Sequence, residues 1–414
     1  MTWISLALRN LLRNARRSIT TIAAVALGYA AINILAGFTS YMFASIEDGH
    51  IYEQVNGHVQ IRKEGAREYG GSDPAAYLIS AEEFSEIKEF AETDERITLS
   101  AGMLDVKGNI DYDGTPGFFV GEAMVPSNKE EIHSRATALR SADGPAYEGK
   151  PITNETPYGI SITTGMAENL GLEIGSDVIL MAPSLSGQMN AVDAEIFQIA
   201  DVASEALDNR YLFMPLELAQ NLYDTEGVSS VRFLADDTDD TDAIVASLRD
   251  RFPDSEWDVV PWYEVSRLYL RTKRMFDIIF GLVFAIITVI VTMSVLNTIG
   301  MAVVERTREI GTLRALGLKR PGVIRLFGIE SGMLGILGAV AGLLITVLFS
   351  FAIDGIEPTW EPPVTAREIV WEIQILPNYL LLTFVILVVF TTLAAIAPAR
   401  RAAKQSIVDS LGHV

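Results

Sequence analysis

The residue types that most often carry chemistry are scarce in this sequence. It contains no cysteine, which excludes disulfides, thiolate metal sites and a cysteine nucleophile. Its four histidines, His50, His58, His133 and His413, never occur at metal-ligand spacing. Neither a GxSxG elbow nor a phosphate-binding GxxxxGK(S/T) loop occurs. We therefore predict a non-catalytic chain with no metal site and no directly bound cofactor.

Acidic side chains are abundant, and their densest run is Asp236–Asp242, with the sequence DDTDDTD. The run lacks the glycine and the closing glutamate of an EF-hand loop. Charge runs of this kind are normally solvated. We expect a surface turn here, with a cation site as the weaker alternative.

The most informative stretch runs from Glu305 to Gly317 and reads ERTREIGTLRALG. The spacing of Ile310, Leu313 and Leu316 predicts a short helix with these side chains on one side. Gly317 is placed to end that helix. A short exposed helix with an apolar and a charged side suits docking into a groove of another protein.

Charge alone does not account for this order of residues. A basic loop on the inner side of a membrane would need only lysines and arginines. Here Glu305 and Arg308 stand at i,i+3, the spacing of a helical ion pair. Gly311 removes side-chain bulk where another backbone approaches. We therefore favour a docking helix over a basic loop.

Four long uncharged stretches surround the segment Glu305–Gly317 in the sequence and are expected to hold it in place. A membrane-spanning helix needs about 20 apolar residues, and the stretches are Ser18–Ile46, Ile278–Val304, Ser331–Ile353 and Pro377–Pro398. Helices buried in a soluble core rarely stay uncharged for so long. The first stretch is also longer than the apolar region of a cleaved signal peptide, about 7–15 residues. We expect an uncleaved anchor.

The charges are distributed unevenly along the 414 residues, whose net charge is −21. The segments before the first span, between the second and third spans and after the fourth contain 13 basic and 3 acidic residues. The segment 44–276 contains 18 basic and 43 acidic residues. Because lysine and arginine near membrane ends favour the cytoplasm, both termini and the segment 305–325 are expected inside. The acidic region is expected outside, and its charge argues against nucleic acid as a partner.

Between Ala44 and Arg274 the pattern is mixed α and β. Short β-rich runs predict strands at His58–Arg62, Phe118–Val120, Val178–Met181, Ile196–Ile199, Tyr211–Met214, Val231–Leu234 and Trp257–Val260. Helices are expected at Ser80–Phe90, Thr163–Leu170, Leu216–Tyr223 and Thr241–Phe252. The first of these opens with a capping box formed by Ser80 and Glu83. The polar segment 121–156 is interpreted as a second lobe or a long insertion.

Two helices are expected to rise from the membrane into this domain. Trp262–Arg274 is charged and runs without glycine or proline into the second span, and the first span continues uncharged to Ile46. Such a pair either transmits rigid-body motion or serves as an inert connector.

The third span is rich in glycine, which lets helices approach closely in lipid. We expect packing positions at Gly328, Gly332, Gly335, Gly338 and Gly342. Asp277 and Glu330 lie at the ends of predicted spans, where we expect interfacial rather than proton-relay roles.

Three segments resemble MacB/FtsX-type ABC transporter permeases. ERTREIGTLRALG is similar to the family signature after the second span, Leu6–Ala23 to its N-terminal amphipathic helix and first span, and Ala395–Leu411 to its closing pattern. In size and layout the chain resembles the LolC and LolE permeases, whereas the signature reads more like the MacB pattern. The chain departs from MacB in lacking a fused ATPase domain.

In this family the short cytoplasmic helix docks into the nucleotide-binding subunit. The resemblance therefore implies ATPase contacts at Glu305, Arg306, Glu309, Gly311, Leu313, Arg314 and Gly317. ATP and Mg²⁺ would bind to that partner. The other implied partners are a second ATPase copy, a second permease chain (identical or related), a periplasmic carrier or adaptor protein, and membrane lipid.

The predicted fold class is an α-helical membrane protein with four transmembrane helices and a large mixed α/β extracytoplasmic domain between the first and second. Its predicted parts are an amphipathic helix (1–17), transmembrane helix 1 and stalk (18–46), the α/β domain (47–262), stalk and transmembrane helix 2 (263–304), the coupling helix and loop (305–325), transmembrane helix 3 (326–353), a short outer loop (354–376), transmembrane helix 4 (377–398) and a cytoplasmic tail (399–414).

The resemblance implies a permease subunit in the bacterial inner membrane that works by mechanotransmission. It would couple ATP hydrolysis in a separate subunit to extraction or export of a lipoprotein or other amphiphile. Two alternatives stay open: MacB-like tripartite efflux of peptides or drugs, and an FtsX-like non-transporting regulator of a cell-wall hydrolase. An adaptor bound to the outer domain would favour efflux, and a soluble carrier would favour lipoprotein release.

Overall fold

The computed structural model describes residues 3–13, 15–71, 73–136, 147–201, 205–253, 255–265, 267–360 and 369–406. The chain divides into two compact units, each with its own hydrophobic core. The helical unit comprises Met1–Met42, Lys273–Pro358 and Trp371–Val414. The α/β unit comprises Phe43–Thr272 and Thr359–Val370.

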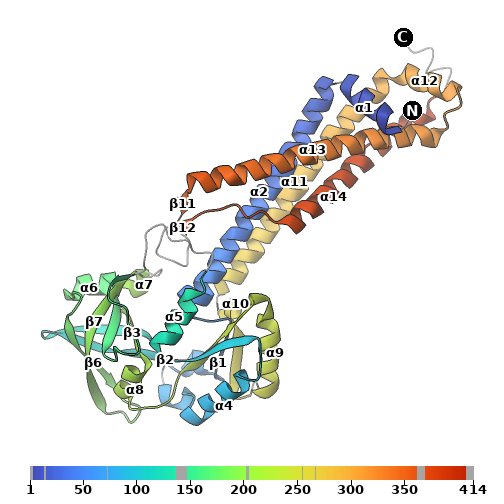
Figure 1. Ribbon diagram of the computed structural model, residues 1–414. Coiled ribbons are helices and arrows are strands. Elements are labelled where there is room, and N and C mark those ends of the chain that lie inside the picture. The colour runs from blue at the N-terminus through green and yellow to red at the C-terminus, as the bar shows by residue number, and fades with distance from the viewer. Residues whose placement is uncertain are drawn as a thin grey trace. The chain divides into compact units, whose positions relative to one another are not determined.

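Long apolar helices make up the helical unit. They are α1 (Trp3–Arg13), α2 (Ala15–Asp48), α11 (Arg267–Glu305), α12 (Thr307–Ala315), α13 (Arg320–Ile356), α14 (Pro377–Ala394) and α15 (Ile396–Lys404). Within the described residues, four helical segments are long and apolar enough to cross a membrane, and they coincide with the four uncharged stretches. Figure 1 shows α1 and α12 at the same end of this unit.

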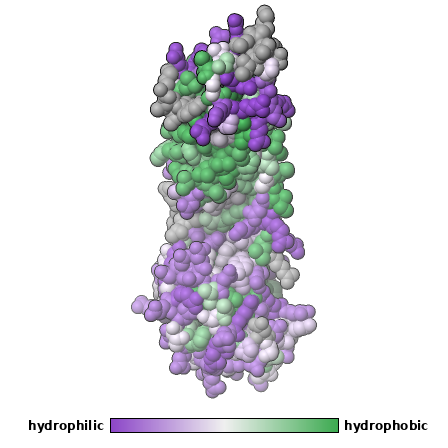
Figure 2. All heavy atoms as spheres, turned by 90° about the vertical axis from the view of Figure 1, so that its right-hand side faces the viewer, coloured by the Kyte–Doolittle hydropathy of each residue, from purple (hydrophilic) through white to green (hydrophobic). Residues whose placement is uncertain are grey.

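Apolar side chains cover much of the outside of the helical unit. Along α11, Ile278, Leu282, Ile286, Val289 and Met293 are all exposed. Figure 2 shows the resulting hydrophobic band on the helical unit, bordered by hydrophilic side chains at its end. Apolar surface of this length matches the hydrocarbon core of a bilayer, so these side chains are suited to contact lipid.

α13 packs closely against α2 and α14 through its glycines. A methyl group on Gly338 would lie 2.5 Å from Val25, and one on Gly335 would overlap the Thr391 hydroxyl. A methyl group on Gly342 would lie 2.6 Å from the Ala26 carbonyl oxygen, and one on Gly332 would lie 3.1 Å from Thr392. At Gly328 no atom of another described helix lies within 4 Å of the corresponding methyl position. The glycines from 335 to 342 therefore set the helix spacing.

Ten strands of the described residues form one sheet in the α/β unit. They are β1 (Val59–Lys63), β2 (Ile97–Tyr112), β3 (Thr115–Met124), β4 (Tyr147–Gly149), β5 (Gly159–Thr163), β6 (Asp177–Pro183), β7 (Met189–Ala200), β8 (Tyr211–Pro215), β9 (Ser230–Ala235) and β10 (Trp257–Pro261). Their order is β10-β1-β9-β2-β3-β8-β5-β7-β4, and β6 pairs with both β2 and β7. β11 (Thr359–Trp360) and β12 (Ile369–Val370) form a separate small pair.

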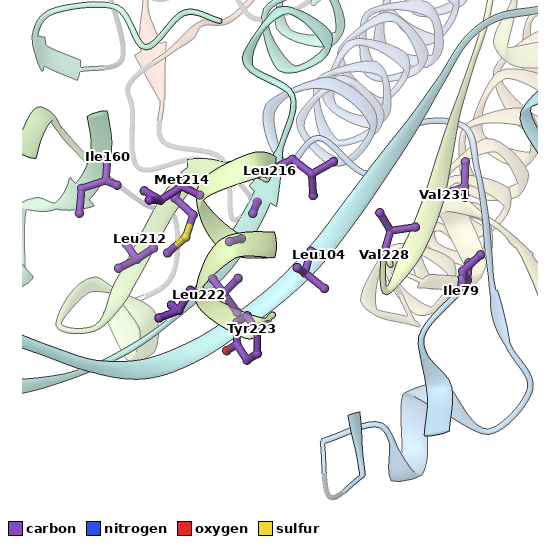
Figure 3. Close-up of a cluster of buried hydrophobic side chains, with 14 of the residues drawn as sticks. Ile79, Leu104, Ile160, Leu212, Met214, Leu216, Leu222, Tyr223, Val228 and Val231 are labelled. Atoms are coloured by element: carbon purple, nitrogen blue, oxygen red, sulfur yellow. The ribbon is translucent and has the colours of Figure 1, made fainter. Parts of the chain in front are cut away.

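Short helices connect the strands, and several of them bury apolar side chains in the core of the sheet. The helices are α3 (Ala66–Tyr69), α4 (Ala81–Ala91), α5 (Pro126–Ser134), α6 (Thr164–Leu170), α7 (Glu205–Asp208), α8 (Leu216–Tyr223), α9 (Thr241–Arg251) and α10 (Trp262–Val265), with single turns η1 (Gly49–Glu53), η2 (Pro74–Tyr77) and η3 (Thr238–Asp240). Ile87 from α4, Leu222 from α8 and Ile244 from α9 share one core with strand residues such as Leu104 and Val231. Figure 3 shows part of this core.

Three local features predicted from the sequence are present in the structure. The capping box at the start of α4 is present: Glu83 N–H donates to the Ser80 hydroxyl (3.2 Å), and Ser80 N–H donates to the Glu83 carboxylate (2.9 Å). α6 ends at Gly171, whose φ of 66° is left-handed. The acidic run forms a surface turn that leads into α9. Within this turn the Asp239 N–H donates to the Asp237 carboxylate (3.0 Å).

Two parts of the α/β unit differ from the prediction. β2 is the longest strand of the described residues, yet it was missed: its apolar alternation changes phase between Met103 and Leu104, and Gly108 stands at an apolar position. The segment 121–156 is not a separate lobe in its described parts: it completes β3, forms α5, and returns to the same sheet as β4, which pairs with β7. Residues 137–146 lie outside the described residues.

Candidate functional site

α12 is a separate short helix because the chain turns at both of its ends. At Arg306 the backbone leaves helical geometry (φ −108°, ψ 16°). The Thr307 hydroxyl then donates to the carbonyl of Val303 (3.0 Å), one of the carbonyls that the end of α11 leaves unpaired. After the last turn, Gly317 adopts φ +102°, a conformation that favours glycine.

Arg306 anchors the start of α12 inside the helical unit. Its side chain is 6% exposed and that of Glu330 on α13 is 4% exposed, and the closest guanidinium–carboxylate distance between them is 3.2 Å. Arg306 Nε also contacts Glu309 (3.1 Å), and its guanidinium lies 5.7 Å from the Phe327 ring centroid. A buried ion pair is tolerated only when its groups are well paired. This arrangement meets that condition.

Two half-exposed ion pairs connect this region to α1 and α2. Arg13 on α1 bonds Glu309 at 2.8 Å, and Arg17 on α2 bonds Glu305 at 2.7 Å. The hydrogen bond from Arg13 lowers the pKa of the Glu309 carboxyl. Exposed pairs contribute about 0–1 kcal/mol each. Their main effect is to fix which parts of α1, α2, α11 and α12 lie together.

The far end of α12 is tied down as well. Ile310 is 4% exposed and belongs to the same core as Leu11, Val323 and Ala399. The Arg314 guanidinium donates to the backbone carbonyl of Gln405 beyond α15. α12 therefore contacts elements from both ends of the chain.

The opposite side of α12 is exposed in the part of the chain that the structure describes, and it carries mixed chemistry. Arg308, Thr312, Ala315 and Leu316 are exposed, and Leu316 is 81% exposed. We call these four residues the α12 outer face. An apolar side chain so exposed, beside a cation and a hydroxyl, suits a contact with another protein.

The residues predicted to contact a partner do not all lie on the exposed surface. Arg306 and Gly311 are buried inside the helical unit, and Leu313 and Arg314 are partly buried. Glu305 bonds Arg17 and not Arg308, because Glu305 closes α11 whereas Arg308 belongs to α12. Leu316 does not share a side with Ile310, because the helix ends at Ala315.

Other residues of this region escaped the sequence prediction. Arg13 and Arg17 pair with glutamates about 300 positions away in the sequence, and no local signal points to such pairs. Glu330 was expected at the end of a span, but α13 begins at Arg320 and buries it. Arg308, Thr312 and Ala315 stand at i, i+4 and i+7, the spacing of one helix side, but periodicity does not show which side of the helix is exposed.

The sequence matches two protein families over most of its length. Residues 18–251 match the MacB-like periplasmic core domain. Residues 280–407, which include α12, Arg306 and Glu330, match the FtsX-like permease C-terminal domain.

Individual relatives agree with these families. The chain is 21% identical to an uncharacterized ABC transporter permease of Methanocaldococcus jannaschii, over 99% of this chain and 97% of that protein. It is 26% identical to the lipoprotein-releasing system transmembrane protein LolC of Neisseria meningitidis, over 62% of this chain and 65% of LolC. It is 24% identical to the macrolide export ATP-binding/permease protein MacB of Chlorobium luteolum, over 84% of this chain and 53% of MacB. This chain belongs to the FtsX/MacB/LolC family of ABC transporter permeases.

Proposed function

We propose that this chain is the permease subunit of a mechanotransmitting ABC transporter whose ATPase is a separate protein. The observation that supports this proposal most strongly is the α12 outer face. This face is exposed, whereas the other side of the helix is fixed by buried contacts. In this proposal the ATPase subunit binds that face, together with the exposed parts of Glu305, Glu309 and Gly317. ATP and Mg²⁺ stay on the partner.

Movement of α12 would be passed on because the helix is not free to move alone. The Arg306–Glu330 pair joins its start to α13, and the Arg13–Glu309 pair joins it to α1. The Arg17–Glu305 pair joins α2 to the end of α11, directly before α12. A push on α12 therefore acts on several membrane-spanning helices together. α2 and α11 each run as one helix across the boundary between the helical and α/β units, at residues 42/43 and 272/273. Continuous helices are suitable levers for rigid-body motion.

The proposed orientation follows the charge asymmetry. The end of the helical unit that contains α1 and α12 would face the cytoplasm, and the acidic α/β unit would lie outside. Four spans are few for a transport pathway, so a second permease chain, identical or related, and two ATPase copies complete the proposed complex. A periplasmic carrier or adaptor would bind the α/β unit.

The proposed cargo is a lipoprotein or another amphiphile taken from the outer leaflet. The similarity to LolC supports this cargo. The match of 18–251 to the MacB-like periplasmic core domain favours a second candidate, tripartite efflux of peptides or drugs. The FtsX-like match leaves a third, a non-transporting regulator of a cell-wall hydrolase.

Purification of the tagged chain from its own cells in mild detergent, with every partner identified and counted, tests this proposal. Two ATPase copies per two permease chains are the expected result. Co-purification of a soluble carrier or an acylated protein would support lipoprotein release, whereas an adaptor would support efflux. A cell-wall hydrolase in the absence of any ATPase would overturn the transporter proposal.

A further inference from the structure

The α/β unit contains a cavity of about 280 Å³ at a gap in its sheet. On the side away from β3, β2 pairs with β9 up to Met103 and with β6 from Asn109 onward. The stretch between them, residues 104–108, has no strand on that side among the described residues. The cavity lies beside this gap.

At the gap, side chains and not a neighbouring strand bond to the backbone N–H and C=O groups of β2. The Asp105 N–H donates to the Ser229 hydroxyl (2.9 Å). The Lys107 N–H donates to the Tyr223 hydroxyl (2.6 Å), which in turn donates to the Lys107 carbonyl (2.6 Å). An extended peptide would have to displace these bonds to add as a strand. Recognition in this cavity therefore depends on side chains.

Most of the cavity wall is apolar. Leu78, Leu104, Val106, Val120 and Leu185 line it, and Leu104 and Val106 also belong to the buried core. In Figure 3, Leu104 lies between Tyr223 on one side and Val228 and Ile79 on the other. The volume is close to the lower end of the range of ligand pockets, about 300 Å³. It suits a single acyl chain better than a whole lipid.

Two cations and one carboxylate line the cavity. Arg62 bonds Asp105 at 3.1 Å, and the Lys107 ammonium donates to the Gly71 carbonyl. The Nε of Arg62 is buried and has no hydrogen-bond partner within the described residues. One positive charge is left over, in a chain segment that is otherwise strongly acidic. The free donor and the excess charge favour an anionic group here.

We infer that this cavity binds a single-chain anionic amphiphile, with its acyl chain against the apolar wall and its head group at Arg62 and Lys107. The inference deepens the proposed function, because it assigns a ligand class to the α/β unit of a transporter of amphiphiles. It does not depend on the α12 outer face, so the two proposals fail separately.

The test uses the full chain in lipid nanodiscs with dodecanoate that carries a photoreactive diazirine at its chain end. After illumination, mass spectrometry identifies the labelled residues. Saturable labelling of the segments 66–71, 74–78, 104–107 and 223–229 is the expected result. Dodecanoate or dodecyl phosphate should compete with the label, and dodecanol should compete about tenfold more weakly, since it cannot accept a charge-assisted bond from Arg62.

Three variants sharpen the test. Arg62→Gln removes the cation and should weaken labelling about tenfold, and Ala66→Trp fills the cavity and should abolish it. Arg67→Gln is the matched control, because Arg67 bonds Asp258 (3.0 Å) and does not line the cavity. Labelling confined to the membrane-spanning helices, equal labelling in all variants, or equal competition by dodecanol would overturn the inference. ATPase recruitment, measured on the same samples, should not change in any variant.

Discussion

Arg306 shows how a single side chain can connect a surface helix to a membrane-spanning one. The cost of removing its charge from water is offset by Glu330 and Glu309, both within 3.2 Å of the guanidinium. Surface charges in the same region, such as Arg13, contribute much less free energy. At the residue scale, the buried pair is therefore the main electrostatic contact of α12.

Breaking that pair should destabilise the helical unit. Glu330→Leu leaves the Arg306 guanidinium buried without its carboxylate, and we expect the free energy of unfolding to fall by about 3–5 kcal/mol. The double variant Arg306→Met/Glu330→Leu removes both charges and should recover most of that loss. Thermal unfolding in detergent checks both. A single variant that unfolds like the wild type would show that Arg306 is not desolvated.

His58 makes the α/β unit sensitive to acid. Its Nδ1 accepts from the Ala235 N–H (3.0 Å), and its Nε2 bonds the Thr238 hydroxyl (3.3 Å), so the folded state requires the neutral ring. Burial lowers the pKa of His58 to about 4. The unfolded chain binds the proton at about pH 6.5. Stability is therefore full above that pH and falls by about 3 kcal/mol as the pH drops to about 4.

The variant His58→Asn isolates this effect. Asparagine keeps an acceptor near the Ala235 N–H but does not titrate in this range. Denaturation of the wild type and the variant, followed by tryptophan fluorescence between pH 4 and 8, gives two stability curves. Their difference should shrink as the pH falls below 6.5. Parallel curves would mean that the pKa of His58 is the same in the folded and the unfolded chain, which contradicts the buried neutral ring.

At the scale of elements, the glycines of α13 set the distances between helices. Gly338→Leu would force a side chain into Val25 on α2, and overpacking of this kind costs about 1–3 kcal/mol or more. Gly328→Leu adds the same side chain where no neighbour lies within 4 Å. We expect the melting temperature to fall by several degrees for the first variant and to stay unchanged for the second. Equal effects would contradict the packing described for α13.

The elements that the sequence predicted correctly are those with a local physical signal. Long uncharged stretches predicted the membrane-spanning helices, and the capping box of Ser80 and Glu83 predicted the start of α4. β2 was missed because its apolar alternation changes phase between Met103 and Leu104, so no single period-2 pattern covers the whole strand. The contacts of Arg306 were missed because they are tertiary: Glu330 lies on another helix. Helix periodicity alone could not tell the buried side of α12 from its outer face.

At the scale of the whole molecule, the orientation in the membrane is open to a clean experiment, because the sequence has no cysteine. Single cysteines at exposed positions can be labelled without background. A membrane-impermeant maleimide added to intact spheroplasts should label Ser186→Cys in the α/β unit. It should label Ala315→Cys on α12 only after the membrane is opened. The reverse pattern would refute the orientation derived from the charge asymmetry.

Recruitment of the ATPase subunit by the α12 outer face is the step on which the proposed coupling depends. Its most direct test compares co-purification of that subunit with three full-length chains: the wild type, Arg308→Glu/Leu316→Asp, and Arg308→Lys/Leu316→Met. The last pair keeps the charge and the apolar area, and both substituted positions are exposed, so the fold is preserved in each variant. We predict that the charge-reversed variant inserts normally but retains less than about a tenth of the ATPase, a loss of about 1.4 kcal/mol or more in binding, while the conservative variant retains it. Equal recovery of the ATPase by all three chains would contradict the account.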